Sequence, residues 1–363
     1  MEEKEEKKEF QTQILQEEEK EAKLKATEEE VDHILRIVSP GTNFRSSLEG
    51  VVHAKKGALI VVEIEGIQQI LDGGFKINSK FTPQKIVELS KMDGAITLSK
   101  DMKRITQANV MVYPDKKIST RETGTRHKTA ERTAKMLGTL VATVSERRGE
   151  IAVYYKNFRH IVKDVNDLLR KVNEQVQIIE KQRELFDLNV EKLTQSELRN
   201  NLNIQQASTV IQKGRLIEKM ADDVKDLFLE LGNEGTIIKT RLKELTTDIE
   251  KEINLVIKDY TKVDLKKSRI LINSLNYEEI LDSDNIIKSL AYGEDKKVEK
   301  IRGWRVLSKT SLDESDIAAL TKELASLGKT IYSNVNSYKN IIGEEKANLF
   351  KEEVDQIKRN YFS

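Results

Sequence analysis

The segment ETGTRHKTAERTAKMLG, residues 122–138, combines a helical pattern with the wrong charge for the start of a helix. Arg126, His127 and Lys128 fall in the first turn, and Gly138 is typical of a residue that ends a helix. Because a helix N-terminus carries a partial positive charge, each cation there costs about 0.3–1 kcal/mol. A bound anion at this end would offset that cost.

The same helix start offers groups that bind anions. Backbone N–H groups in a first turn have no helical partners, and they favour negative charge. Thr125 and Thr129 add hydroxyl donors, and the Arg126 guanidinium matches two phosphate oxygens at once. The segment therefore predicts a polyphosphate site. The alternative is a surface helix whose cations are partly relieved by Glu122 and Glu131.

A second stretch, KMDGAITLS at 91–99, places Asp93 and Gly94 just before a predicted strand. A carboxylate at the mouth of a strand can hold a divalent cation, and a glycine lets the backbone approach a flat ligand closely. The alternative for Gly94 is an ordinary helix cap.

A third stretch, VSERRGE at 144–150, joins two predicted strands. Ser145, Arg147 and Arg148 crowd this short turn, and they would serve as a second set of phosphate donors. The alternative is a charged hairpin tip without a ligand.

The elements that must position these side chains follow from the hydrophobic pattern. Helices are predicted over 82–92, where Thr82 and Pro83 form a typical start, and over 126–137. Asp72-Gly73-Gly74 is predicted as a turn with positive φ. Runs of apolar and β-branched residues predict strands over 57–64, 93–99, 108–113, 139–146 and 150–156. Strands and helices in alternation predict an α/β domain with a mixed central sheet over 31–157.

The rest of the chain is predicted to be helical. It contains no proline, whereas all three prolines lie before residue 115. A helical linker domain is expected over 158–297 and a small helical module over 298–363. One apolar stripe, which fits either a coiled coil or a helical bundle, consists of Ile161, Val165, Leu168, Val172, Val176 and Ile179. LGNEG at 231–235 is predicted as a turn between helices.

Composition excludes several classes of protein. The chain of 363 residues has no cysteine, so disulfides, thiolate zinc sites and a cysteine nucleophile are excluded. No apolar run approaches the length of a membrane span, and the N-terminus has no signal-peptide core, so we expect a cytoplasmic protein without a membrane partner. Its net charge of +1 predicts no global attraction to nucleic acid. Residues 1–30, rich in Glu and Lys, are predicted to be a solvated helix or disordered extension.

Five blocks in this order and spacing, LDGGF, KMDGAITLS, ANVMVYPD, ETGTRHKTAERTA and VSERRGE, resemble the DNA integrity scanning (DisA) family of diadenylate cyclases. The resemblance covers 31–157. In layout it continues through a helical linker to a C-terminal module like a helix-hairpin-helix. It implies an α/β nucleotide-binding domain that joins two ATP molecules into cyclic di-AMP, releases two pyrophosphates and uses Mg²⁺ or Mn²⁺. It also implies that two such domains meet face to face in a homo-octamer, with possible regulation by branched DNA.

The resemblance also implies roles for single residues. Asp93 would hold the metal near the attacking 3′-hydroxyl, and Gly94 and Val112 would flank the adenine and ribose. The triphosphate would be bound by Thr125, Arg126, His127, Lys128 and Thr129, with Ser145, Arg147 and Arg148 at its terminal phosphates. The expected catalytic residues are Asp93, Arg126 and His127, with His127 as a phosphate donor rather than a general base.

The sequence departs from the family pattern at two places. Lys128 replaces the usual arginine, which keeps the charge but loses the bidentate fork, so we expect weaker ATP binding. In the C-terminal turn Ile341 replaces the first of two glycines, and a β-branched residue resists positive φ. Glu344 and Glu345 would repel DNA phosphates, although Lys329, Lys339 and Lys346 remain as candidate contacts. A packing module is the alternative for this region, and a DNA-binding or scaffold protein whose nucleotide site serves only assembly is the alternative for the chain.

Overall fold

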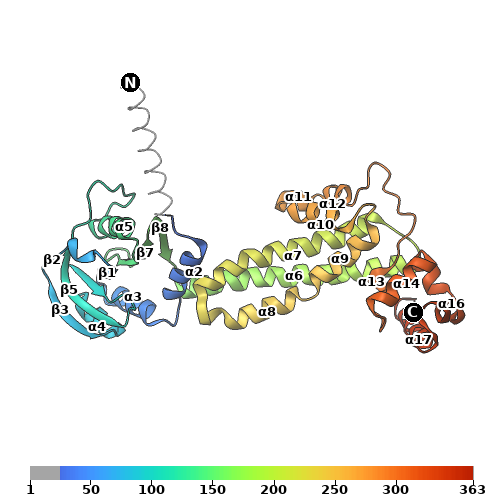
Figure 1. The fold of residues 1–363 in the computed structure, drawn as a ribbon, viewed down its shortest axis with the longest axis horizontal. Helices are drawn as coiled ribbons and strands as arrows, with labels where there is room; N and C mark the ends of the chain where they lie inside the picture. Colours follow the sequence, from blue (N-terminus) through green and yellow to red (C-terminus); the bar gives the residue numbers. More distant parts are fainter. Residues whose placement is uncertain (1–24, 363) are drawn as a thin grey trace, which may run out of the picture. The chain divides into compact units, whose positions relative to one another are not determined.

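The computed structural model describes residues 25–362, so most of the predicted N-terminal extension lies outside the described residues. The chain divides into two compact units. The first runs to Lys171 and includes Asp226–Thr236, and the second comprises Val172–Lys225 and the chain from Ile237 onward. Figure 1 labels the helices and strands of both units.

The first unit is built on one mixed sheet, as the sequence predicts. Its strands are β1 (Ala58–Val62), β2 (Leu71–Asp72), β3 (Phe75–Lys80), β4 (Ala95–Leu98), β5 (Arg104–Val112), β6 (Val141–Val144), β7 (Ile151–Tyr155) and β8 (Phe158–Val162). They lie in the order β2-β5-β4-β1-β6-β7-β8, with β3 also paired to β5. β1 and β4 are parallel, and the other pairs are antiparallel. A sheet of this kind has two faces to cover.

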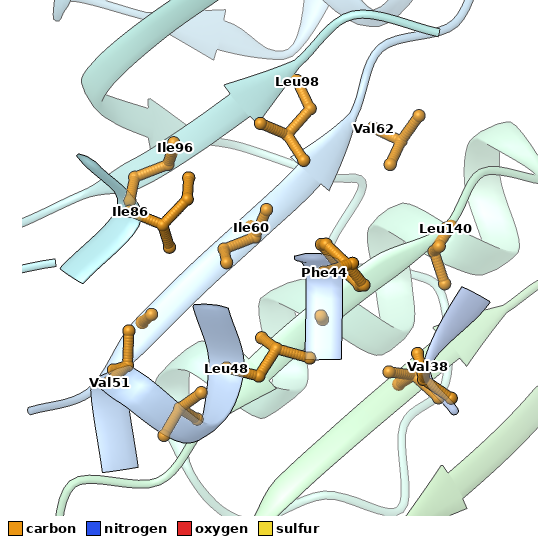
Figure 2. Close-up of a cluster of buried hydrophobic side chains, with 14 of the residues drawn as sticks. Val38, Phe44, Leu48, Val51, Ile60, Val62, Ile86, Ile96, Leu98 and Leu140 are labelled. Carbon is orange, nitrogen blue, oxygen red and sulfur yellow. The ribbon is translucent and has the colours of Figure 1, made fainter. Parts of the chain in front are cut away.

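Helices cover both faces of the sheet at its central strands. All five residues of β1 are buried, and they alternate between two hydrophobic cores. Ile60 enters the core under α2 (Glu28–Ile37), α3 (Asn43–His53) and α4 (Pro83–Leu89), where it lies among Phe44, Leu48 and Ile86 (Figure 2). Val61 enters the core under α5 (Thr125–Leu137). This alternation explains why the strand reads as one continuous apolar run.

The helices on the first face begin at polar caps. Thr82 caps α4 and Pro83 occupies its first turn, as predicted. The sequence analysis missed α2 and α3, which begin after Thr27 and Thr42, each accepting a backbone N–H at its helix start. Thr27 lies within the predicted extension 1–30, so the folded part of the first unit begins before residue 31.

Strand β8 corrects the helical prediction after residue 157. It pairs with β7 along its whole length, from Tyr155 opposite Phe158 to Ile151 opposite Val162. Ile161, assigned to the helical stripe, therefore lies in a strand and is 38% exposed. The later part of the predicted stripe is confirmed, because Leu168, Val172, Val176 and Ile179 are buried in α6 (Val165–Leu198).

The second unit is a helical bundle. At Gly214 of α7 (Ile204–Leu231), a Cβ atom would lie 2.6 Å from Ile253 of α9 (Ile249–Tyr260) and 3.0 Å from Phe186 of α6. Three helices therefore meet at one small residue. The other helices of this unit before residue 300 are α8 (Thr236–Thr246), α10 (Leu265–Ser274), α11 (Tyr277–Leu281) and α12 (Ser283–Ser289). The short η2 (Gly232–Gly235), at the predicted turn, belongs to the first unit. Within residues 25–362, none of the helices has the length and hydropathy that a membrane crossing requires.

The C-terminal helices of the second unit are α13 (Trp304–Leu307), α14 (Glu314–Leu324), α15 (Leu327–Tyr332), α16 (Val335–Ile342) and α17 (Glu344–Phe362). Only Gly343 separates α16 from α17, and its φ is +84°. Ile341 lies in the last turn of α16 and has no positive φ, so the strain expected from a β-branched residue at this position does not arise.

Candidate active site

One edge of the sheet gathers most of the residues singled out in the sequence. β1 and β4 are parallel, so Gly57, which precedes β1, and Asp93 and Gly94, which precede β4, lie at the same edge. β5 and β6 run antiparallel to these strands, which brings Val112 at the end of β5 and Ser145 just after β6 to that edge as well.

The start of α5 lies at this edge and has no acidic partner in its own first turn. Its N-cap is Gly124, which makes no side-chain capping bond. Thr125 opens the helix, one residue before the predicted start, and the side chains of His127 and Lys128 have no hydrogen-bond partner within residues 25–362. The first-turn N–H groups and their partial positive charge therefore remain available to an anion.

Glu122 and Glu131, the two glutamates of the sequence alternative, are engaged elsewhere. Glu122 accepts hydrogen bonds from Tyr154 and Arg159 on β7 and β8. Tyr154 is buried, and burial together with Glu122 raises the pKa of its hydroxyl. The sequence alternative, in which Glu122 relieves the helix start, has no support in these contacts.

Glu131 holds the loop before α5 rather than the helix start. Its carboxylate accepts bonds from the Thr120 hydroxyl, the Arg121 N–H and Lys135. Burial would raise the pKa of Glu131, but the bonds from Lys135 and Thr120 outweigh it and lower the pKa. Arg132 and Lys135 also donate to backbone carbonyls of residues 118 and 119, so the loop that leads into the helix is fixed at several points.

Arg126 already faces a carboxylate. Its guanidinium Nη1 lies 3.7 Å from Oε2 of Glu146, in the turn between β6 and β7, and its side chain is 39% exposed. The guanidinium also lies directly against Gly57. Glu146 thus occupies the kind of position that a phosphate oxygen would take. Such a half-exposed ion pair contributes only about 0–1 kcal/mol, so an anion with more charge can replace it.

Gly94 is not a helix cap, because α4 already ends at Leu89 with Ser90 as its cap. Its φ is +86°, and a Cβ atom would lie 2.8 Å from the Asn109 carbonyl carbon and 2.9 Å from the Val110 N. Both are backbone atoms of β5, so only glycine fits here. The close approach fixes the position of the neighbouring Asp93 at the strand mouth.

Asp93 is exposed and makes no hydrogen bond or ion pair with any residue that the structure describes. Within residues 25–362 there is no group of three or more Asp, Glu, His or Cys side chains able to hold a metal ion. A single carboxylate suits Mg²⁺ or Mn²⁺ that reaches the site with substrate phosphates and keeps several waters. It does not suit a cation that the protein must hold alone.

The turn after β6 presents the remaining predicted donors. Ser145 Oγ accepts the Arg148 N–H at 3.3 Å, and the Arg148 guanidinium lies 3.7 Å from Glu150. Arg147 is exposed and pairs with no carboxylate among the described residues. Of the three, Ser145 belongs to the edge itself, whereas both arginines point from an exposed turn.

Two residues at this edge escaped the sequence analysis. Gly57 begins an apolar run, and a glycine at the start of a buried strand often marks a close approach of another group. Glu146 lies between Ser145 and Arg147, within a block that had been singled out for its cations. Its pairing with Arg126 depends on the fold and has no local signal.

Comparison with known proteins assigns the chain to a family. The family model described as DisA bacterial checkpoint controller nucleotide-binding matches residues 45–158, and the one described as DisA bacterial checkpoint controller linker region matches residues 162–299. The DNA integrity scanning protein DisA of Clostridium beijerinckii is 34% identical over 337 residues, which cover 90% of this chain and 95% of that protein. That of Clostridioides difficile is 38% identical over 284 residues, which cover 76% and 80%.

A solved structure of DacA from Staphylococcus aureus covers 33% of this chain and 85% of its own at 23% identity, but its TM-score of 0.28 is too low to support an argument. The family models and the curated relatives agree with each other over both the sheet unit and the helical linker. The chain therefore belongs to the DisA family of diadenylate cyclases.

Proposed function

We propose that the protein condenses two ATP molecules into cyclic di-AMP and releases two pyrophosphates, at an interface where two of its sheet edges face each other. The observation that supports this most is the α5 start, which carries Arg126, His127 and Lys128 and has no acidic residue in its first turn. It lies at the same sheet edge as Asp93 and Ser145. A nucleotide triphosphate supplies the negative charge that this arrangement lacks.

The family resemblance then gives each residue a role. The first-turn N–H groups, with Thr125, Thr129 and Lys128, bind the triphosphate, and Arg126 and His127 neutralise the charge that develops during transfer. Ser145, Arg147 and Arg148 bind the terminal phosphates. Gly94 and Val112 border the adenine and ribose.

The chemistry requires two copies of the site. In each half-reaction the 3′-hydroxyl oxygen of one ATP forms a bond to the α-phosphorus of the other, the bond from that phosphorus to the bridging oxygen breaks, and pyrophosphate leaves. The hydroxyl proton passes to solvent. One sheet edge has one α5 start and so binds one ATP, and a ring with two such linkages needs a second edge. Positioning and charge neutralisation suffice, and no protein nucleophile is needed.

Asp93 would hold the divalent cation together with the phosphates of the bound nucleotide. When bound, Mg²⁺ or Mn²⁺ neutralises phosphate charge and makes the 3′-hydroxyl more acidic. The family as a whole depends on divalent metal. The chain's own contribution is the exposed carboxylate of Asp93, whose backbone position is set by the close approach of Gly94 to β5.

The test is product analysis. The purified chain is incubated with ATP and Mn²⁺ or Mg²⁺, and the products are separated by chromatography and identified by mass. The unaltered protein is expected to form cyclic di-AMP, and Asp93→Asn to form none while its far-UV circular dichroism is unchanged. Asp101→Asn, an exposed aspartate beyond the other end of β4, is the matched control and should be active. Normal cyclisation by Asp93→Asn would refute the metal assignment, and bound but unconverted ATP would favour a scaffold.

For the C-terminal module, we propose at most weak regulation by branched DNA. Lys339 is paired with Glu344, and Lys346 with Asp313 and Asp316, so two of the three candidate lysines already face carboxylates. Neither family model extends past residue 299. Cyclase activity measured with and without a four-way DNA junction is expected to change less than two-fold, and strong inhibition would contradict this. An octameric, cytoplasmic enzyme remains the expectation from the family resemblance.

A further inference from the structure

Gly57 has no conformational reason to be glycine. It lies just before β1, and its φ is not in the left-handed region. The reason is space, because a Cβ atom at this position would lie 2.1 Å from Nη1 of Arg126 and 2.8 Å from Cζ. It would also lie 3.3 Å from Cβ of Glu146. The guanidinium of Arg126 therefore occupies the volume that any other residue would fill with its side chain.

We propose that Gly57 is a positioning residue for Arg126: the missing side chain at the start of β1 is what allows the guanidinium to lie at the sheet edge where the triphosphate binds. This inference rests on the proposed function, in which Arg126 binds phosphate. Gly57 itself contacts neither substrate nor metal in this account. It acts only by leaving room, with Glu146 as the partner that holds the guanidinium before nucleotide arrives.

The geometry separates this role from a role in folding. The two closest atoms that a new methyl group would meet belong to the far end of a long, flexible side chain, so Arg126 can swing away without movement of the backbone, and the Cβ of Glu146 at 3.3 Å needs to give only slightly. Gly57 has no positive φ, so alanine can adopt the same backbone conformation without strain. Gly57→Ala should therefore leave the fold intact and displace the guanidinium. An ordinary packing defect would instead lower the stability of the fold.

The test is a double-mutant cycle on the full chain. The dissociation constant for ATP is measured by calorimetry for the unaltered protein, Gly57→Ala, Arg126→Ala and the double variant. Loss of a charge-assisted contact predicts about ten- to hundred-fold weaker binding for Arg126→Ala. Gly57→Ala should bind ATP about ten-fold more weakly or worse, and it should not weaken binding further when Arg126 is already alanine. KM for ATP should rise in step with the dissociation constant.

Gly293→Ala is the matched control, because Gly293 has no positive φ and no atom within 4 Å of its Cβ position. It should bind ATP like the unaltered protein, and thermal unfolding should show that all variants are folded. Unaltered affinity in Gly57→Ala would overturn the inference, and so would an equal loss in the Arg126→Ala background, since the effect would then not pass through Arg126. If the affinity of Arg126→Ala for ATP equals that of the unaltered protein, the role of Arg126 in the proposed function is wrong.

Discussion

Replacing Gly94 by alanine tests how the sheet edge is built. At φ +86° an L-residue with a Cβ atom pays about 1–2 kcal/mol. The added methyl group would also meet backbone atoms of Asn109 and Val110 at 2.8–2.9 Å, and these atoms cannot turn aside as a side chain can. Overpacking of this kind costs about 1–3 kcal/mol, which gives a total of about 2–5 kcal/mol.

Gly66 provides a matched control for the backbone term. It has the same φ of +86°, but no atom lies within 4 Å of its Cβ position, so Gly66→Ala should cost only about 1–2 kcal/mol. The difference between the two variants isolates the close approach of Gly94 to β5. We expect it to be about 1–3 kcal/mol.

Hydrogen exchange with mass spectrometry is the suitable assay, because it reports the opening free energy of β4 and β5 directly. Tryptophan fluorescence would mislead, since the single tryptophan, Trp304, lies in the second unit. Equal opening free energies in Gly94→Ala and Gly66→Ala would refute the reasoning. They would mean that the edge yields easily and does not fix the position of Asp93.

Three further variants extend the account. Lys128→Arg should lower the dissociation constant for ATP, measured by calorimetry, because it restores the bidentate fork. Hydrogen bonds from Lys156 and the Thr27 N–H lower the pKa of Glu30 from 4.5 to about 2. The ionised carboxylate therefore stabilises the fold above about pH 4.5, and this contribution is lost as the pH falls toward 2. In Glu30→Gln, the free energy of unfolding, measured by circular dichroism, should fall less between pH 4.5 and pH 2 than in the unaltered protein. Arg305→Ala should destabilise the second unit by about 3–5 kcal/mol, followed by tryptophan fluorescence in urea, because it leaves the buried Glu197 without its cation.

Each of these has a contradicting outcome. An unchanged ATP affinity in Lys128→Arg would mean that the charge alone matters at this position. If the free energy of unfolding of Glu30→Gln falls with pH as steeply as that of the unaltered protein, Glu30 is not a stabilising group. If Arg305→Ala lowers the free energy of unfolding of the second unit by well below 1 kcal/mol, water or a neighbouring group compensates the buried carboxylate of Glu197.

Local signals predicted the elements around the candidate site well where the relevant contacts are themselves local. The start of α5 and the apolar run of β1 were placed within one or two residues, because charge, capping and burial pattern act over a single turn or strand. The gathering of Asp93 and Ser145 at one edge followed from the resemblance, and the parallel and antiparallel pairings give it a physical basis. Their roles in binding stay predictions.

Features that depend on contacts between distant segments could not be predicted from the sequence. FRHIV at 158–162 fits a period of two, but Ile161 also fits the helical spacing of the residues that follow, and only pairing with β7 decides between them. Glu131 pairs with its helical neighbour Lys135, and it also accepts hydrogen bonds from Thr120 and Arg121 in the preceding loop, which no local pattern predicts. The contact between Gly57 and Arg126 joins segments far apart in the chain, and no periodicity reports it.

The C-terminal turn shows a different limit. Ile341 was predicted to resist a conformation that the usual glycine adopts, and the physical rule is sound. The chain avoids the conflict by keeping Ile341 helical and giving the positive φ to Gly343 alone. Ile341 is therefore accommodated within the helix without backbone strain.

The most direct measurement of the central claim is a crystal structure of the protein with 3′-deoxy-ATP, which lacks the attacking hydroxyl and so cannot cyclise. The account predicts the triphosphate at the start of α5, with Arg126 released from Glu146 and turned to the phosphates, and the ribose facing the same edge of a second copy. A triphosphate bound elsewhere on the chain, with the ion pair between Arg126 and Glu146 intact, would contradict it.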